Sequence, residues 1–252
     1  MGRDLGIDAA GNRAGDALCR VPGPGRWLGG VVVAAASLVG SVLASVGGLA
    51  TRAMPAAAAG GGIVVLGKVV ALVQAVLGMQ WRQRPPTEDE KALLSAVYRD
   101  SVNLDAIRLV PGYAGVFSAN PRPFTLGNTI YLKKSTHPAT LVHECAHVWQ
   151  YQHLGSRYTF EALRAQAKVK PSAYRWADEL DRGRAHWREF NREAQAQFLE
   201  DLVRHGHQIP PAGRTGEFFA ADPVSEAVRF IRDGVDHTDL ARTTVAEIRA
   251  TH

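Results

Sequence analysis

The stretch Thr140-Leu-Val-His-Glu-Cys-Ala-His-Val-Trp-Gln150 carries two histidines four positions apart, His143 and His147. On a helix, residues at this spacing lie one turn apart on the same face, so both imidazoles can bind one metal ion. Glu144 follows the first histidine, and its carboxylate can take a proton from a metal-bound water. The pattern therefore predicts a catalytic zinc site with His143 and His147 as ligands and Glu144 as the general base.

The residues around this motif favour a buried helix. Pro138 is typical of a first helical position, with Thr136 or His137 as the cap, and Gly155 is placed to end the helix. The flanking residues are uncharged, as expected of a helix beside a cleft: Val142, Cys145, Ala146 and Val148. A solvated histidine–glutamate pair on an exposed helix is the alternative interpretation.

A catalytic zinc needs a third protein ligand and an open position for water. Glu193, in Phe190-Asn-Arg-Glu-Ala-Gln-Ala196, is the leading candidate. It lies at the edge of the apolar face of a helix that we expect over residues 183–204, where a carboxylate can reach inward. A solvated glutamate is the alternative. Other residues compete for the role of third ligand: His186, Glu189, Glu161 and Asp178.

The same helix places a second carboxylate, Asp201, inside its apolar face. A buried carboxylate needs a partner, and the outward N–H of a ligating histidine is one that would fix the imidazole. Gln197, one turn after Glu193, could serve similarly. For Asp201, a structural salt bridge with an arginine is the favoured alternative.

Residues 124–132, Phe-Thr-Leu-Gly-Asn-Thr-Ile-Tyr-Leu, predict a strand with a turn or bulge at Gly127-Asn128, just before the metal helix. An edge strand there would pair with the extended backbone of a peptide substrate, and an ordinary structural strand is the alternative. The candidates for this pairing are Thr125, Leu126, Gly127, Asn128, Thr129 and Ile130. The candidates for stabilising an oxyanion are Tyr131, Tyr151, Tyr158 and Tyr174.

The N-terminal third differs in composition from the rest. Residues 1–26 have no apolar period and predict a disordered tail. Residues 28–50 carry no charge and are long enough to cross a bilayer, while a flexible linker and a signal peptide are the alternatives. Small residues at every fourth position would allow close helix packing in lipid: Ala36, Gly40, Ala44 and Gly48.

Residues 63–79 predict an amphipathic helix, with Leu66 and Val69 on its apolar face and Lys68 and Gln74 on the other. Such a helix could lie in a membrane interface, pack on the first apolar helix or cover the core of a soluble domain. If both apolar segments cross a membrane, the flanking arginines place both ends in the cytoplasm.

The overall composition narrows the function classes. The net charge is +5 and the isoelectric point is about 9.4, yet the basic residues are scattered and form no block. We therefore expect no nucleic-acid partner. The two cysteines, Cys19 and Cys145, predict no disulfide framework.

Three motifs in order, namely residues 124–132, residues 140–150 and residues 190–196, resemble a family of small bacterial zincin-like proteins. These are gluzincin-type metallopeptidases, some of them related to Vgr proteins or found near contractile injection systems. The resemblance covers about half the chain, roughly residues 87–205. It implies Glu193 as the third zinc ligand, and it implies a metal site more strongly than proteolysis. The chain departs from the family at Cys145-Ala146, where a Leu-Thr-like pair is expected, and the ligands are unaffected.

Together these patterns predict an α+β, mainly helical chain, with a zincin-like domain, a short hairpin or sheet edge before the metal helix, and apolar helices in front. The expected parts are a disordered tail over 1–26, apolar helices over 27–82, the metal-binding domain over 83–210 and a helical extension over 211–252. The leading function is a zinc metallopeptidase acting on a peptide or protein, bound at the cytoplasmic membrane with a cytoplasmic catalytic domain. The alternatives are a soluble cytoplasmic protein and a non-catalytic, zinc-stabilised module of a bacterial secretion or injection apparatus.

Overall fold

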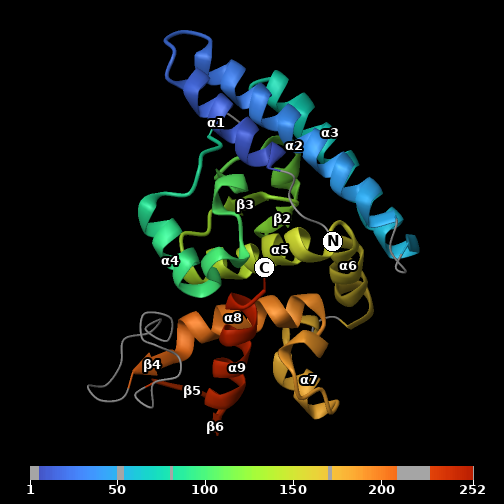
Figure 1. Ribbon diagram of the computed structural model, residues 1–252, viewed down its shortest axis with the longest axis vertical. Helices are drawn as coiled ribbons and strands as arrows, with labels where there is room; N and C mark the ends of the chain where they lie inside the picture. Colours follow the sequence, from blue (N-terminus) through green and yellow to red (C-terminus); the bar gives the residue numbers. More distant parts are fainter. Residues whose placement is uncertain (1–5, 50–53, 80–81, 170–171, 209–227, 252) are drawn as a thin grey trace.

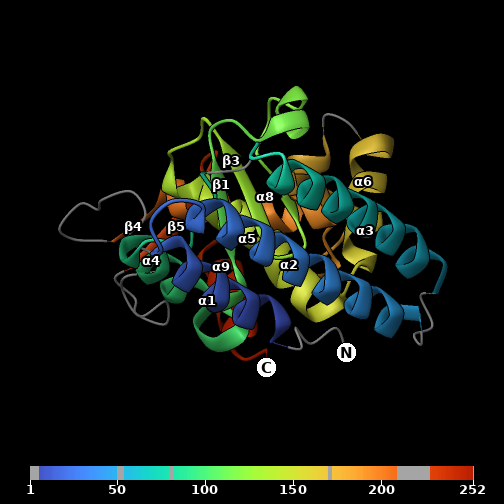
Figure 2. The ribbon, with the colours of Figure 1, turned by 90° about the horizontal axis from the view of Figure 1, so that it is seen from above.

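The computed structural model describes residues 6–49, 54–79, 82–169, 172–208 and 228–251. It is mainly helical, with small sheets and two apolar N-terminal helices, as expected. Three helices lie side by side as a layer over one face of the molecule (Figure 1 and Figure 2). They are α1 (Ile7–Cys19), α2 (Gly25–Leu49) and α3 (Met54–Val76).

Helix α1 corrects the expectation of a disordered tail over residues 1–26, of which residues 1–5 lie outside the described part. Its inner face is polar, so it has no apolar period, and its partners lie far along the chain. Asn128 Nδ2 donates to Asp8 Oδ2 at 2.6 Å, and Arg108 donates to Asn12 and Asp16. The helix is therefore ordered by distant hydrogen bonds that a local pattern does not reveal.

Small residues let α1 approach α2 closely. A Cβ added at Gly11 would lie 2.1 Å from Ala36 Cβ, and one at Gly15 would lie 2.7 Å from the carbonyl oxygen of Gly29. Gly40 lies against the carboxylate of Asp8. The regularly spaced small residues of α2 thus allow close packing against α1 as well as against the other apolar helix.

Helices α2 and α3 are both long and apolar enough to cross a membrane. The expected amphipathic helix over 63–79 is part of α3, which begins earlier, at Met54, and ends earlier, at Val76. Lys68 Nζ donates to Ser37 Oγ at 2.7 Å and to Thr129 Oγ1 at 2.8 Å. The polar face of α3 is therefore its inner face.

Below this layer, α4 (Glu88–Tyr98) begins at a capping box formed by Thr87 and Glu90. A sheet follows with the order β1-β3-β2, formed by β1 (Arg108–Pro111), β2 (Phe124–Leu126) and β3 (Thr129–Lys133). Strand β3 pairs parallel with β1 and antiparallel with β2. The expected strand over 124–132 is thus a hairpin that turns at Gly127, whose φ of 60° favours glycine.

The central helix α5 (Pro138–Leu154) packs against α8 (Arg192–His205) across the hydrophobic core. Between them in sequence lie α6 (Arg157–Val169) and α7 (Trp176–Asp181). The expected helix over 183–204 begins only at Arg192, because Asn191 caps it with its side-chain oxygen. Short 3₁₀ segments complete this part of the chain: Arg99–Ser101, Leu104–Ala106, Gly115–Ala119, Ser172–Tyr174 and Trp187–Glu189.

The C-terminal part corrects the expectation of a helical extension over 211–252. The described residues form β4 (Gly206–Gln208), β5 (Val228–Arg232), β6 (Val235–Asp236) and α9 (Thr238–Arg249), and residues 209–227 lie outside the description. Phe230, Val245 and Ile248 are fully buried in the same core as α5 and α8. This segment therefore completes the main domain instead of extending from it.

Candidate metal centre

Helix α5 presents the two histidines as the sequence predicts. His137 caps the helix through its side chain, Pro138 occupies its first turn, and Gly155 ends it with a φ of 65°. Nearly every residue of α5 is buried, including His143 and His147, whose ring centroids lie 5.2 Å apart. The helix thus fixes two imidazoles on one face inside the protein.

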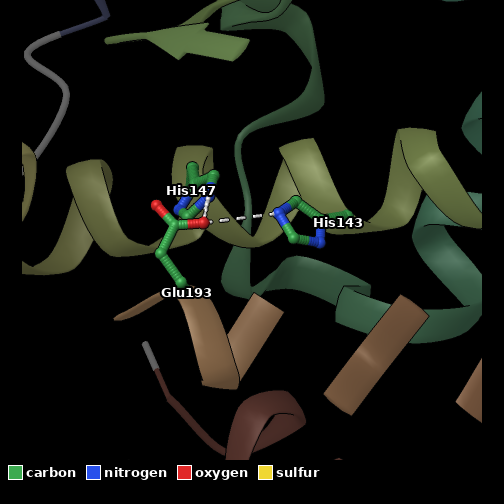
Figure 3. A group of neighbouring side chains, drawn as sticks. All are labelled: His143, His147 and Glu193. Carbon is green, nitrogen blue, oxygen red and sulfur yellow. Dashed lines mark ion pairs between the residues drawn. The ribbon is translucent and has the colours of Figure 1, made fainter. Parts of the chain in front are cut away.

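Glu193 reaches these histidines from the first turn of α8 (Figure 3). Its Oε2 lies 3.7 Å from His143 Nε2 and 3.5 Å from His147 Nε2. All three side chains are buried, and their nearest donor atoms lie within 4.8 Å of one another. Glu193 was the leading candidate for this position, and the structure brings it to both histidines.

The donor set fits a tetrahedral zinc ion. Zinc bonds to histidine nitrogen and carboxylate oxygen are about 2.0–2.2 Å long, so neighbouring ligand atoms lie about 3.4 Å apart. The distances of 3.5 and 3.7 Å are close to this value. Two imidazoles and one carboxylate leave a fourth position for water or substrate. The group could therefore hold a metal ion.

Three polar side chains hold the ligands in place. Glu200 Oε2 lies 3.0 Å from His143 Nδ1, and Gln150 Oε1 lies 2.9 Å from His147 Nδ1. Gln166 Nε2 donates to Glu193 Oε1 at 2.8 Å, so the other oxygen of Glu193 faces the histidines. Contacts of this kind fix the orientation and tautomer of a ligating side chain.

These three residues replace the partners expected from the sequence. Asp201 accepts hydrogen bonds from Trp176 Nε1 at 2.9 Å and Gln197 Nε2 at 2.9 Å, and it lies 3.8 Å from Arg232 Nε. The salt-bridge alternative for Asp201 is therefore the one that the structure supports. Gln197 lines the cleft, but its amide supports Asp201.

A sequence signal for the true partners did exist. Glu200 lies seven positions after Glu193, on the same face of α8, and Gln150 lies three positions after His147 on α5. Three of the other candidates for third ligand have partners elsewhere, and the fourth, His186, is exposed and lies outside the group of His143, His147 and Glu193. Glu161 pairs with Arg157 and Arg192, and Asp178 with Arg175, while Glu189 bonds the backbone of His186.

The two carboxylates control the charge of the histidines. Burial alone would lower the pKa of His143, but its hydrogen bonds with Glu193 and Glu200 outweigh burial and raise the pKa to about 10. The pKa of His147 is also raised, by Glu193 acting against burial. Burial would raise the pKa of Glu200, but His143 and Arg204 lower it to about 2. Without a metal, these carboxylates therefore favour the protonated form of His143.

Glu144 faces the same cleft as the metal ligands. Its Oε2 accepts a hydrogen bond from Thr125 Oγ1 at 2.8 Å, and the same hydroxyl lies 3.0 Å from the Glu144 carbonyl oxygen. Burial raises the pKa of Glu144, while His143, His147 and Thr125 oppose the rise. A carboxylate with a raised pKa is a stronger base, as the predicted role of Glu144 requires.

The candidate ligands His143, His147 and Glu193 line a cleft of about 870 Å³. Its walls come from α3, α6, the 117–126 segment and α8, and they include aromatic side chains: Phe117, Phe124, Tyr158 and Tyr174. Of the four tyrosines considered as oxyanion stabilisers, Tyr158 and Tyr174 line the cleft. Burial and the nearby Glu193 raise the pKa of Tyr174 to about 12, so it stays a proton donor at neutral pH.

The structure narrows the expected substrate strand. Only Thr125 and Leu126 lie on the outer strand β2, whereas Thr129 and Ile130 lie in β3, which pairs on both sides. Asn128 is committed to Asp8 and Gln152, and Gly127 forms the turn. The prediction of a six-residue substrate strand, 125–130, is wrong in its second half, because the segment folds back as a hairpin.

Cys145 lies on the face of α5 away from the cleft and is fully buried, as expected. Burial raises the pKa of its thiol, so it stays neutral.

No protein-family model matches the chain, and neither a curated protein nor a solved structure matches it. The resemblance to zincin-like proteins therefore rests on the three sequence motifs alone.

Proposed function

We propose that the chain is a zinc-dependent metallopeptidase with a zincin-like catalytic domain. The observation that carries this proposal is the convergence of His143, His147 and Glu193 beside Glu144 in one cleft. When bound, zinc would polarise the substrate carbonyl and acidify a water molecule. Glu144, oriented by Thr125, would accept the proton of that water and pass it to the leaving amine. Tyr158 and Tyr174 are the candidates for hydrogen bonding to the carbonyl oxygen.

The shape of the cleft supports a polypeptide substrate. It is open, about 870 Å³ in volume, and bordered by an outer β-strand and by aromatic side chains. A volume of this size accommodates several residues of an extended chain. Thr125 and Leu126 on β2 are the positions where a substrate backbone would pair.

A non-catalytic module of a secretion or injection apparatus, in which zinc only stabilises the fold, is the second candidate. Its support is the depth at which the ligands are buried between α5 and α8. The position of Glu144 favours catalysis, because a purely structural zinc has no use for a carboxylate that faces an open cleft.

We further propose that the protein acts in bacteria at the cytoplasmic membrane, with its catalytic domain on the cytoplasmic side. The two apolar helices α2 and α3 support this location.

The test compares the full-length wild type with Glu144→Gln and Glu193→Ala. We expect about one zinc ion per chain in the wild type and in Glu144→Gln, and much less in Glu193→Ala. Cleavage of a mixed peptide library should fall about 10²–10⁴-fold in Glu144→Gln. Zinc in the wild type without any cleavage would favour the module, and a wild type without zinc would refute both.

A further inference from the structure

Helix α3 turns its apolar face toward solvent and its polar face toward the protein. Leu66 is 67% exposed and Val73 is 51% exposed, whereas Lys68 and Gln74 are each 2% exposed. Lys68 is held by Ser37 and Thr129, and the Gln74 side chain accepts from the backbone N–H of Val116 at 2.6 Å. A surface helix in water has the opposite arrangement.

Helix α2 continues this surface. Val39 is 50% exposed and Val46 is 60% exposed, and both helices belong to the layer on the outside of the molecule (Figure 2). We call the following residues the outer apolar face: Leu28, Val39, Val42, Leu43, Val46, Leu66, Val69, Val73, Val76 and Leu77. Exposed aliphatic side chains gathered on two neighbouring helices mark a place where a partner or a membrane is bound.

The charges around this face favour an anionic membrane. No Asp or Glu occurs between Asp16 and Glu88, whereas several arginines do. Arg20 and Arg26 are exposed at one end of the face. Trp27 lies beside them, 45% exposed, with its indole N–H bonded to the Val76 carbonyl at 2.8 Å. Tryptophan and arginine in this arrangement are typical of the lipid headgroup region.

The packing of α3 opposes a membrane-spanning orientation. Its inner face is buried along its whole length, from Ala57 and Gly60 near its start to Ala71 and Ala75 near its end. Gly60 is so close to α6 that an added Cβ would lie 2.0 Å from the Ser156 carbonyl oxygen. If α3 crossed a bilayer in this packing arrangement, α6 would also lie inside the bilayer.

Helix α6 cannot enter hydrocarbon cheaply. It carries the ion pair of Arg157 and Glu161, 2.6 Å apart, and the exposed Arg164. Each charged group near the centre of a bilayer costs several kcal/mol. An orientation with α2 and α3 parallel to the membrane plane keeps these charges in water and still buries the outer apolar face.

We propose that the outer apolar face docks flat onto the surface of an anionic lipid bilayer, with α2 and α3 in the headgroup region rather than across it. Ile63 and Gly67 of α3 also line the cleft, as does Leu163 of α6. The cleft therefore opens beside the docked face. If the proposed peptidase function holds, its substrate is a polypeptide segment presented at the bilayer surface, such as the juxtamembrane part of a membrane protein.

The first experiment measures flotation of the full-length protein with vesicles of phosphatidylcholine containing 30% phosphatidylglycerol. Leu66→Glu with Val73→Glu should reduce the bound fraction at least tenfold. Val235→Glu is the matched control, since Val235 is 55% exposed but lies on β6, remote from the face, and it should bind like the wild type. Equal binding by all three proteins would overturn the proposal.

The second experiment distinguishes a helix α2 that lies parallel to the membrane plane from one that spans the bilayer. Single nitroxide labels are placed at Leu28, Val39 and Val46, at the two ends and the middle of α2, in a Cys19→Ser background. Equal, shallow depths at all three sites support the proposal. A middle label much deeper than the end labels indicates a spanning helix and overturns it. Protein that stays off vesicles and forms dimers through this face indicates a second copy as the occupant, which also overturns it.

These readouts are independent of the peptidase proposal. Neither flotation nor label depth requires zinc or cleavage, so an inactive protein that docks refutes only the peptidase function. Zinc content and circular dichroism of the Leu66→Glu/Val73→Glu variant should match the wild type, because both side chains point to solvent.

Discussion

Zinc binding should release protons, and the zinc affinity should increase with pH. The reason is that nearby carboxylates favour the protonated form of His143 when no metal is bound. The pKa of His143 is raised to about 10 by Glu193 and Glu200, and a histidine must be neutral to bind a metal. Below pH 10, zinc therefore displaces a proton from His143. As pH rises toward that value, a larger fraction of His143 is already neutral, so the apparent affinity for zinc increases.

The magnitude follows from this single proton. Each pH unit below the pKa weakens the apparent affinity tenfold, or about 1.4 kcal/mol. Between pH 6 and pH 8 we expect a change of about 100-fold, or roughly 2.7 kcal/mol. The raised pKa of His147 adds to this change if it is protonated as well.

The assay is competition between the full-length protein and a chromophoric zinc chelator at several pH values. Calorimetry in buffers of different ionisation enthalpy counts the protons released. Glu200→Gln removes one carboxylate from His143, so its affinity should stop rising at a lower pH than in the wild type. Glu247→Gln changes a distant surface carboxylate and is the control. An affinity that stays constant from pH 6 to pH 8 would refute the reasoning.

Two further predictions concern packing and capping. Gly60→Ala should lower the free energy of unfolding in urea by about 1–3 kcal/mol, because the added Cβ meets the Ser156 carbonyl oxygen. Gly62→Ala is the control: its added Cβ has no atom within 4 Å, so this variant should be more stable than the wild type by about 0.5–1 kcal/mol. Equal effects of the two substitutions would show that α3 does not pack on α6. Asn191→Ala removes the helix cap whose Oδ1 accepts a hydrogen bond from the backbone N–H of Glu193 at 3.0 Å. The variant should lose about 0.5–2 kcal/mol of stability and bind zinc more weakly. An unchanged zinc affinity would show that the position of Glu193 does not depend on the cap.

The central helix could be predicted from the sequence because its signals are local. Pro138 and Gly155 mark its ends, and the spacing of His143 and His147 fixes their common face. Apolar neighbours place Glu193 at the rim of α8, and the structure brings this residue, among several acidic candidates, next to both histidines.

The remaining features depend on how distant segments pack. The polar side chains of α1 gave no sign of order, because Asp8 and Asn12 are bonded to residues about a hundred positions away. The spacing of Glu200 from Glu193 places both on one face of α8, but the pairing of Glu200 with His143 also depends on how α8 packs against α5. The sequence also could not show whether the apolar face of α3 contacts solvent or the protein. A helical period shows which residues share a face, but it does not show what that face contacts.

The hydrogen bond between Asp8 and Asn128 also sets an order of events during synthesis. The two residues are 120 positions apart, so α1 leaves the ribosome well before its partner exists. At about 5–20 residues per second, this delay is about 6–24 s. During that time the apolar helices α2 and α3 are complete, but the sheet and α6, which cover their inner faces, are not. If a nascent chain meets a membrane in this interval, its outer apolar face is covered before the domain that carries the candidate metal centre has folded.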